Sequence, residues 1–361
     1  MTDSNNPTQS GGGDIPPTAS ADPAGGAAPK RKLGTGALIG IATGGLAAIA
    51  ALALVVAFAI VPAIATAAGP SPTDVARDFM TALAKADAKT VLGYLESDKT
   101  AKYATTEVLR ASNKLAPIRV VTIGKPTRET SKQAFIPVTY KMGDKTFRTT
   151  LDVYSTEDSG WQVQDPSVLL YVDRFRPLGA TLNGVKVTSE TVRVLPGTYE
   201  LELTNKNYAV EGGSTLTVAF KQAPDMTTKE PVLSEKGRTT VRTMIKEAVD
   251  ACVASKNLDA GCGIKLAGST SDGITLVEGS LSRSLSASVA AKVDAIEGDV
   301  GIANPLIVEG GFLGAVETTG TCLKDGKEGT CKVLFGSGGF GHPIVDFSSD
   351  PPELRWDSRS F

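Results

Sequence analysis

The chain has 361 residues, with 37 basic and 39 acidic side chains and a formal net charge of −2. This balance excludes the strong basic field with which many proteins hold nucleic acid, so no nucleic-acid partner is expected. A single histidine excludes His-rich metal sites and pairs of histidines in acid/base catalysis. The length is sufficient for two or three domains, but the composition indicates no reaction.

The first residues are unlike the rest of the chain. Residues 1–29 consist mainly of Pro, Gly, Ala, Ser, Thr and Asn and hold almost no large apolar side chain. Such a segment cannot bury enough surface to offset the entropy lost on ordering. The sequence therefore predicts a disordered tail over residues 1–32.

A long apolar run follows the tail. No charged residue occurs from Leu33 to Thr73, and residues 38–61 read LIGIATGGLAAIAALALVVAFAIV. As a helix, this stretch is roughly 36 Å long, enough to cross a hydrocarbon layer of ~30 Å. We therefore expect a transmembrane helix over residues 33–68, with its core at 38–61.

Three cations immediately before the run predict its orientation. Lys30, Arg31 and Lys32 place the N-terminus in the cytoplasm by the positive-inside rule, and residues 69–361 on the extracytoplasmic side. The sequence thus predicts a single-pass protein of the cell membrane, with the lipid bilayer as a partner. A cleaved signal peptide is the alternative, although the apolar core is longer than the ~7–15 residues typical of a signal.

The chain after the run begins with a helix signal. Ser71 is expected to be the N-cap, because its side chain can accept a hydrogen bond from an unpaired N–H group of the first turn. Pro72 is expected to be the first helical residue, because proline has no N–H group to leave unpaired there. Shorter helices are expected around 89–95 and 102–114. The apolar face of the first helix is expected to consist of Val75, Phe79, Ala82, Leu83 and Ala86, which recur at a spacing of three or four residues.

After Pro117 the period of apolar residues changes to two, which is typical of strands. Strands are expected over 118–127, 134–142, 147–153 and 161–163. Helices followed by an antiparallel meander with one apolar face predict an α+β domain at 71–172.

The order of these elements, with the helix sequence VARDFMTALAKADAKTVLGYL, resembles the NTF2-like α+β families over about residues 72–170. These families fold as a cone whose interior can be a ligand pocket or, in some members, an active site. The resemblance implies that Tyr140, Asp152, Tyr154 and Trp161 could line such a pocket. Because Asp152 stands between two apolar positions of its strand, we expect its side chain outside the cone.

Residues 173–222 are expected to form a small β-sandwich-like module. Asn183-Gly184 between two short β-type runs predicts a tight hairpin. The run LNGVKV…VRVLPGTYELEL resembles the PEGA-type β domains of bacterial envelope proteins. That resemblance implies an association with carbohydrate or cell wall.

The remainder is expected to be a linker over 223–238 and a third α+β domain over 239–361. A helix is expected from Thr239, followed by strands over 273–277, 311–316 and 331–335.

All four cysteines, Cys252, Cys262, Cys322 and Cys331, lie in the predicted third domain. Their spacings lack the two-to-four-residue knuckles of zinc sites, so disulfides are expected rather than a metal centre. Of three possible connectivities, we favour Cys252–Cys262 and Cys322–Cys331, because each pair flanks a short loop that contains glycine.

Two motifs could indicate catalysis. Residues 336–341 match G-x-G-x-x-G, but too little chain follows for a βαβ unit, so a glycine-rich loop is expected. His342 could act in nucleophilic catalysis with Asp346 as its orienting partner, yet no G-x-S-x-G sequence occurs. We therefore expect a protein that is not an enzyme, with no catalytic, cofactor-binding or metal-binding residues.

The layout of tail, single span and serial α+β and β modules resembles bacterial envelope proteins of the TcaA (teicoplanin-resistance-associated) type over residues 30–361. The tail lacks the zinc-ribbon cysteines common in that family. The predicted anchor, the serial modules and the lack of a catalytic set favour a non-enzymatic envelope protein that binds or scaffolds wall glycan or another envelope protein. The alternatives are a signalling anchor that recruits a cytoplasmic partner through the tail, and a wall-acting hydrolase on the last domain. The predicted fold class is accordingly α+β, with a disordered tail and one transmembrane helix in front.

Overall fold

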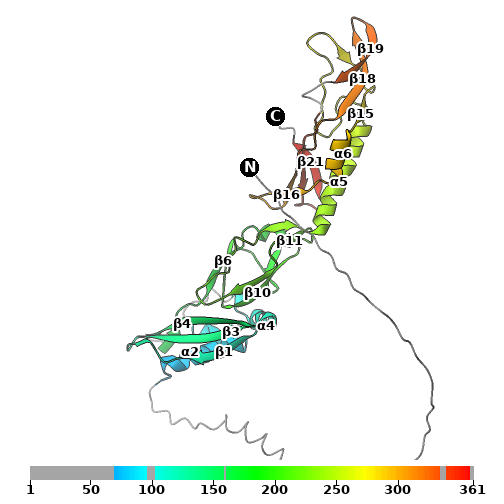
Figure 1. The fold of residues 1–361 in the computed structure, drawn as a ribbon. Coiled ribbons are helices and arrows are strands. Elements are labelled where there is room, and N and C mark those ends of the chain that lie inside the picture. Colours follow the sequence, from blue (N-terminus) through cyan, green and yellow to red (C-terminus); the bar gives the residue numbers. More distant parts are fainter. Residues whose placement is uncertain (1–68, 96–101, 158–159, 334–338, 358–361) are drawn as a thin grey trace, which may run out of the picture. The chain divides into compact units, whose positions relative to one another are not determined.

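A computed structural model describes residues 69–95, 102–157, 160–333 and 339–357 (Figure 1). Of the two units into which the chain divides, the second, Ala67–Phe361, is compact and contains all the described residues. The predicted tail over 1–32, the orienting cations in it and the predicted helix over 33–68 lie outside the described residues. Everything below concerns the described residues of the second unit.

The predicted transmembrane fold is corrected. Within the described ranges, no helix is long and apolar enough to cross a membrane. The longest is α5 (Glu235–Ala254), and its sequence carries charges throughout, among them Lys236, Arg242 and Glu247. The described fold is α+β, dominated by strands and with five α-helices. We therefore withdraw both the membrane-spanning element of the fold class and the single-pass cell-membrane location.

The first helix forms as the sequence predicts. The Ser71 side chain accepts a hydrogen bond from the Asp74 N–H, and the Asp74 carboxylate accepts one from the Ser71 N–H, which is a complete capping box. Two shorter helices follow, each with a side-chain cap from Asp87 or Thr105. The helices are α2 (Pro72–Ala84), α3 (Ala88–Gly93) and α4 (Thr106–Leu115).

These helices cover one antiparallel sheet, in which the strand order is β1-β3-β4-β5 and β2 pairs with β3 (Figure 1). The predicted alternation is confirmed, because every second residue of β3 from Ala134 to Met142 is buried. The strands are β1 (Ile118–Ile123), β2 (Arg128–Glu129), β3 (Gln133–Met142), β4 (Lys145–Thr156) and β5 (Gly160–Val163).

The middle of the chain is built from short strands in three small sheets, ordered β12-β10-β7-β8, β6-β9 and β11-β13. The hairpin predicted at Asn183-Gly184 is confirmed: β7 pairs with β8, and both turn residues have positive φ (46° and 83°). The strands are β6 (Val168–Tyr171), β7 (Ala180–Leu182), β8 (Val185–Lys186), β9 (Thr191–Val194), β10 (Gly197–Leu203), β11 (Tyr208–Val210), β12 (Thr215–Val218) and β13 (Pro231–Leu233).

Two features of the stretch predicted as a linker are different in the structure. It contains β13, and α5 begins at Glu235 rather than at Thr239. Ser234 caps α5 by accepting a hydrogen bond from the Gly237 N–H. The first turn of α5 lacks apolar periodicity, which is why the sequence pattern placed its start too late.

The last region has two four-stranded sheets, β16-β17-β20-β21 and a second in which β18 pairs with β14, β15 and β19. The strand predicted at 311–316 is wrong, since only an isolated bridge joins Ala315 to Gly339 there. The elements are β14 (Thr275–Leu276), β15 (Ser282–Ser284), α6 (Ala287–Asp294), β16 (Gly298–Val300), β17 (Ile307–Gly310), β18 (Glu317–Lys324), β19 (Lys327–Val333), β20 (His342–Asp346) and β21 (Glu353–Asp357).

Two disulfides fasten this last region. Cys252, in the last turns of α5, bonds Cys262, and Cys322 of β18 bonds Cys331 of β19; both pairs have a Cα–Cα distance of 5.8 Å. The connectivity predicted from the sequence is therefore confirmed. Cys252 and Cys262 are each only 1% exposed, so the first bridge lies within the apolar core.

Candidate functional site

The interior predicted for the NTF2-like cone is filled by packed side chains. Tyr140 is 1% exposed. Its ring stacks on that of Phe147 with the centroids 5.4 Å apart, and it meets the ring of Phe220 in a T-shaped arrangement with the centroids 5.2 Å apart. The Phe220 N–H donates a hydrogen bond of 3.3 Å to the Tyr140 hydroxyl. Burial raises the pKa of that hydroxyl above its ordinary value. Phe220 follows β12, far along the chain; the alternating run Leu216-Thr217-Val218-Ala219-Phe220 predicts a strand there but not this contact with Tyr140.

The other residues expected around this pocket do not converge with Tyr140. Asp152 lies on the opposite face of β4 from its buried neighbours, as expected, and accepts hydrogen bonds from the Gln133 amide at 3.0 and 3.2 Å. The Tyr154 hydroxyl donates to the Gln162 side chain at 3.4 Å. Trp161 is half-buried against the core. These four side chains therefore form no common site.

His342 and Asp346 occupy the two ends of β20, four residues apart. A strand rises about 3.3 Å per residue, so their Cα atoms are separated by roughly 13 Å, too far for a direct hydrogen bond. The Asp346 carboxylate instead accepts hydrogen bonds from Ser348, which lower its pKa. The His342 ring lies 6.3 Å from that of Phe312.

The structure bears only partly on the glycine motif and on metal binding. The glycine motif at 336–341 lies partly outside them, since 334–338 are not described. Within the described ranges, no group of three or more His, Cys, Asp or Glu side chains could hold a metal ion.

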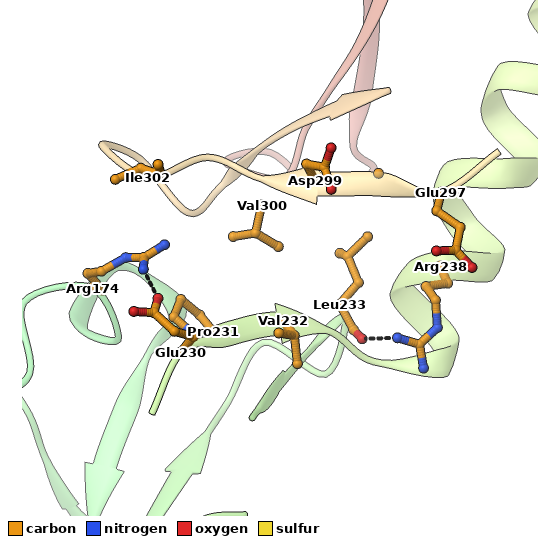
Figure 2. Close-up of a pocket in the computed structure, with 11 residues that line it drawn as sticks. Arg174, Glu230, Pro231, Val232, Leu233, Arg238, Glu297, Asp299, Val300 and Ile302 are labelled. Carbon is orange, nitrogen blue, oxygen red and sulfur yellow. Dashed lines mark hydrogen bonds and ion pairs between the residues drawn. The ribbon is translucent and has the colours of Figure 1, made fainter. Parts of the chain in front are cut away.

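The strongest candidate site is a cleft of about 520 Å³ between β13 and β16. Figure 2 shows Leu233 of β13 and Val300 of β16 pointing into the space between the two strands, while Asp299 points to the other side of β16. The residues around the cleft are Arg174, Glu230, Pro231, Val232, Leu233, Arg238, Glu297, Gly298, Asp299, Val300 and Ile302.

One part of the cleft is bordered by Leu233 and Gly298. Leu233 is 4% exposed, and a Cβ on Gly298 would lie 3.6 Å from its Cδ1 and only 2.3 Å from Val308 Cγ1. Glycine therefore allows β16 to lie against this apolar layer. The Leu233 carbonyl accepts a hydrogen bond of 2.7 Å from Arg238 Nη1, which ties the end of β13 to α5.

Another part of the cleft is bordered by Arg174, Glu230 and Ile302. Arg174 forms an ion pair with Glu230 on one side of the opening. Ile302, in the loop after β16, is 84% exposed and is drawn beside Arg174 in Figure 2. Single exposed aliphatic side chains are common on protein surfaces, so Ile302 is of interest because it borders the cleft.

The arginines of the cleft and Asp299 differ in whether they have an ion-pair partner. Both guanidinium groups have a carboxylate partner, Arg174 with Glu230 and Arg238 with Glu235 at 3.3 Å. Figure 2 shows Glu297 pointing toward Arg238. Asp299, in contrast, forms no ion pair within the described residues.

Comparisons with protein-family models, with curated proteins and with solved structures found no match for this chain. The resemblances expected from the sequence therefore stay predictions, and the functional argument rests on the geometry of the cleft.

Proposed function

We propose that this protein is a binding or scaffolding protein that holds a segment of another polypeptide in the cleft between β13 and β16. The observation that carries this proposal is the cleft itself, which joins an apolar floor at Leu233 and Val300 to a charged opening. A buried apolar centre with a polar rim is the usual anatomy of a protein–protein interface.

The walls of the cleft are fixed before any partner arrives, which favours binding because little has to be ordered on association. On one side, the Ser234 N–H donates to the Asn207 carbonyl at 2.9 Å, and the Ser234 hydroxyl donates to the Lys206 carbonyl at 2.7 Å. On the other side, β16 is held by its pairing with β17.

The chemistry of the lining favours a polypeptide over a sugar. The apolar residues that border the cleft are aliphatic or proline, among them Pro231, Leu233, Val300 and Ile302, and the lining contains no aromatic ring. Aliphatic side chains of a partner would lose water against this floor, and each buried CH₂ group contributes about 0.8 kcal/mol. Wall glycan is the other outcome that an experiment must distinguish.

The two disulfides support a role where such bonds form and persist, which is an oxidising environment. Binding experiments should therefore use protein in which both bridges are intact.

Site-specific photo-crosslinking in cells that make the protein tests the proposal. A photoreactive residue at Ile302 should form an adduct with one defined polypeptide, identified by mass spectrometry. The same residue placed at Val121, which is 54% exposed on β1, is the matched control and should not capture that polypeptide. Adding Val300→Arg to the Ile302 protein should abolish the adduct, because the longer side chain fills the cleft.

Two results would overturn the proposal. The first is an identical set of adducts from positions 302 and 121. The second is an adduct at 302 that contains carbohydrate and no peptide.

A further inference from the structure

We propose, building on the function above, that the cleft takes its partner as an added β-strand on the open edge of β16, and that this strand alternates aliphatic and basic side chains. The occupant is thus an extended peptide segment whose recognition combines backbone hydrogen bonds with two distinct side-chain environments.

The edge of β16 is open. β16 is the outermost strand of its sheet, and β17 is its partner. The Gly301 N–H donates to the Ile307 carbonyl, which fixes the alternation of the antiparallel pair: Asp299 exchanges hydrogen bonds with Glu309. The backbone groups of Gly298 and Val300 therefore point away from β17, and no backbone partner for them occurs among the described residues.

One face of an added strand would meet an apolar surface. Val300 is on the face of β16 that looks toward Leu233 (Figure 2). Side chains of successive residues alternate between the two faces of a sheet. Every second residue of the guest segment would therefore enter the cleft, where an aliphatic side chain suits the floor of Leu233 and Val300.

The opposite face would meet negative charge. Asp299 stands directly across from Glu309 in the strand register, and both side chains are exposed. Neither forms an ion pair within the described ranges. Like charges directly opposite each other on a sheet repel and are destabilising, whereas a cation placed beside them is attracted to both carboxylates. A lysine or arginine on the guest strand supplies that cation.

The edge of β16 carries neither lysine nor proline. Natural edge strands are often blunted by lysine or proline. The edge strand β19 carries Lys327 and Lys332, whereas β16 reads Gly-Asp-Val. An exposed edge without a lysine is suited to accept a strand from a basic segment.

Fluorescence anisotropy with the full chain and a labelled peptide tests this proposal. The probe is an alternating leucine–lysine peptide of about six residues, the usual length of a strand. Its affinity should exceed that of a peptide of the same composition with all leucines before all lysines, and that of an alternating leucine–glutamate peptide. N-methylation of the residues whose N–H faces β16 should abolish binding, while N-methylation of the intervening residues should leave it unchanged.

Variants of the protein sharpen the result. Asp299→Lys should weaken the leucine–lysine peptide by about fivefold or more and strengthen the leucine–glutamate peptide, because the cross-strand charge pair changes sign. Asp144→Lys, in the exposed turn between β3 and β4, is the matched control and should change neither affinity. Val300→Pro removes an edge N–H that has no internal partner and should abolish binding, with an unchanged unfolding midpoint as evidence of folding.

The outcomes separate this proposal from the function it rests on. If the peptide binds equally well when N-methylated at either set of positions, strand addition is wrong. If no peptide binds while the crosslink at Ile302 persists, the cleft holds a partner in another way, and strand addition is again wrong. If the crosslink is absent as well, the proposed function fails with it.

Discussion

Two helix-on-sheet regions of this molecule hold themselves together by different means. The region from α2 to β5 packs large side chains, including Phe79, Met80 and Tyr140, into one core under a single sheet. The region from α5 to β21 divides its strands between two sheets. Val241, Ile245 and Val249 are buried along α5, and Phe340 and Phe347 are buried elsewhere in the region. Both disulfides belong to this second region.

The difference lies in the covalent cross-links. A fully buried aromatic or aliphatic side chain contributes about 1.5–3 kcal/mol in either region, and this burial has to offset the entropy lost when the chain is ordered. A disulfide lowers that entropy cost by constraining the unfolded chain. One tryptophan in each region, Trp161 in β5 and Trp356 in β21, allows the two to be followed separately.

The largest expected effect is on the aromatic core. Phe220→Ala should lower the free energy of unfolding by about 3–5 kcal/mol, because it leaves a cavity beside Phe79 and Tyr140. Urea unfolding of a Trp356→Phe background, followed by Trp161 fluorescence, measures it. Val121→Ala, at a side chain of β1 that is 54% exposed, is the control in the same region and should cost less than about 1 kcal/mol. Equal effects of the two would show that Phe220 is not part of this core.

Removal of the buried disulfide should come next. Replacing Cys252 and Cys262 together by alanine should cost about 3 kcal/mol, mostly from the closed loop in the chain-entropy picture. The transition seen by Trp356 in a Trp161→Phe background should move, and the one seen by Trp161 should not. The Cys322→Ala/Cys331→Ala protein is the matched control; its loop is as long, but it crosslinks an exposed hairpin, so its loss should be smaller. The contrast between regions fails if both tryptophans respond equally to the first pair.

Local features of the fold could be predicted from the sequence, and long-range ones could not. The cap at Ser71 and the turn at Asn183-Gly184 depend only on neighbours within four residues, so the residue types at those positions were enough to predict both. Phe220 packs on Tyr140, 80 positions earlier, and the alternation of Leu216, Val218 and Phe220 predicts a strand without indicating that contact. The same limit concealed the cleft, because Arg174, Leu233 and Gly298 come from three distant segments. The signal that could have revealed its floor was the Pro-Val-Leu run just before the Ser234 cap.

Helix caps in the two regions should have smaller effects. Ser71→Ala removes a capping box and should cost about 1 kcal/mol, read by Trp161. Ser286 caps α6 with a single hydrogen bond to the Val289 N–H, so Ser286→Ala should cost the same or less, read by Trp356. A larger loss at Ser286 would contradict the view that the last region depends on its disulfides more than on its helices.

The smallest expected effect is a pH dependence at Asp74. Hydrogen bonds from Ser71, then Arg77, lower its pKa in the folded protein. A carboxyl with a lowered folded-state pKa stabilises above its unfolded value, about 3.9, and that stability is lost as pH falls through the folded pKa. Urea midpoints read by Trp161 from about pH 5 downward should therefore fall less steeply for Asp74→Asn than for the unchanged chain. Asp144→Asn is the control and should keep the original slope.

Phe220 gives the first region a late closing step in the order of synthesis. The sheet from β1 to β5 is complete once residue 163 has been made, but the ring that fills the space beside Phe79 and Tyr140 arrives 57 residues later. Until then, a nascent chain leaves an apolar hollow open to water. A protein shortened to end near residue 172 would keep that hollow permanently and should be prone to self-association. The β-rich middle of the chain therefore completes the core of the region that precedes it.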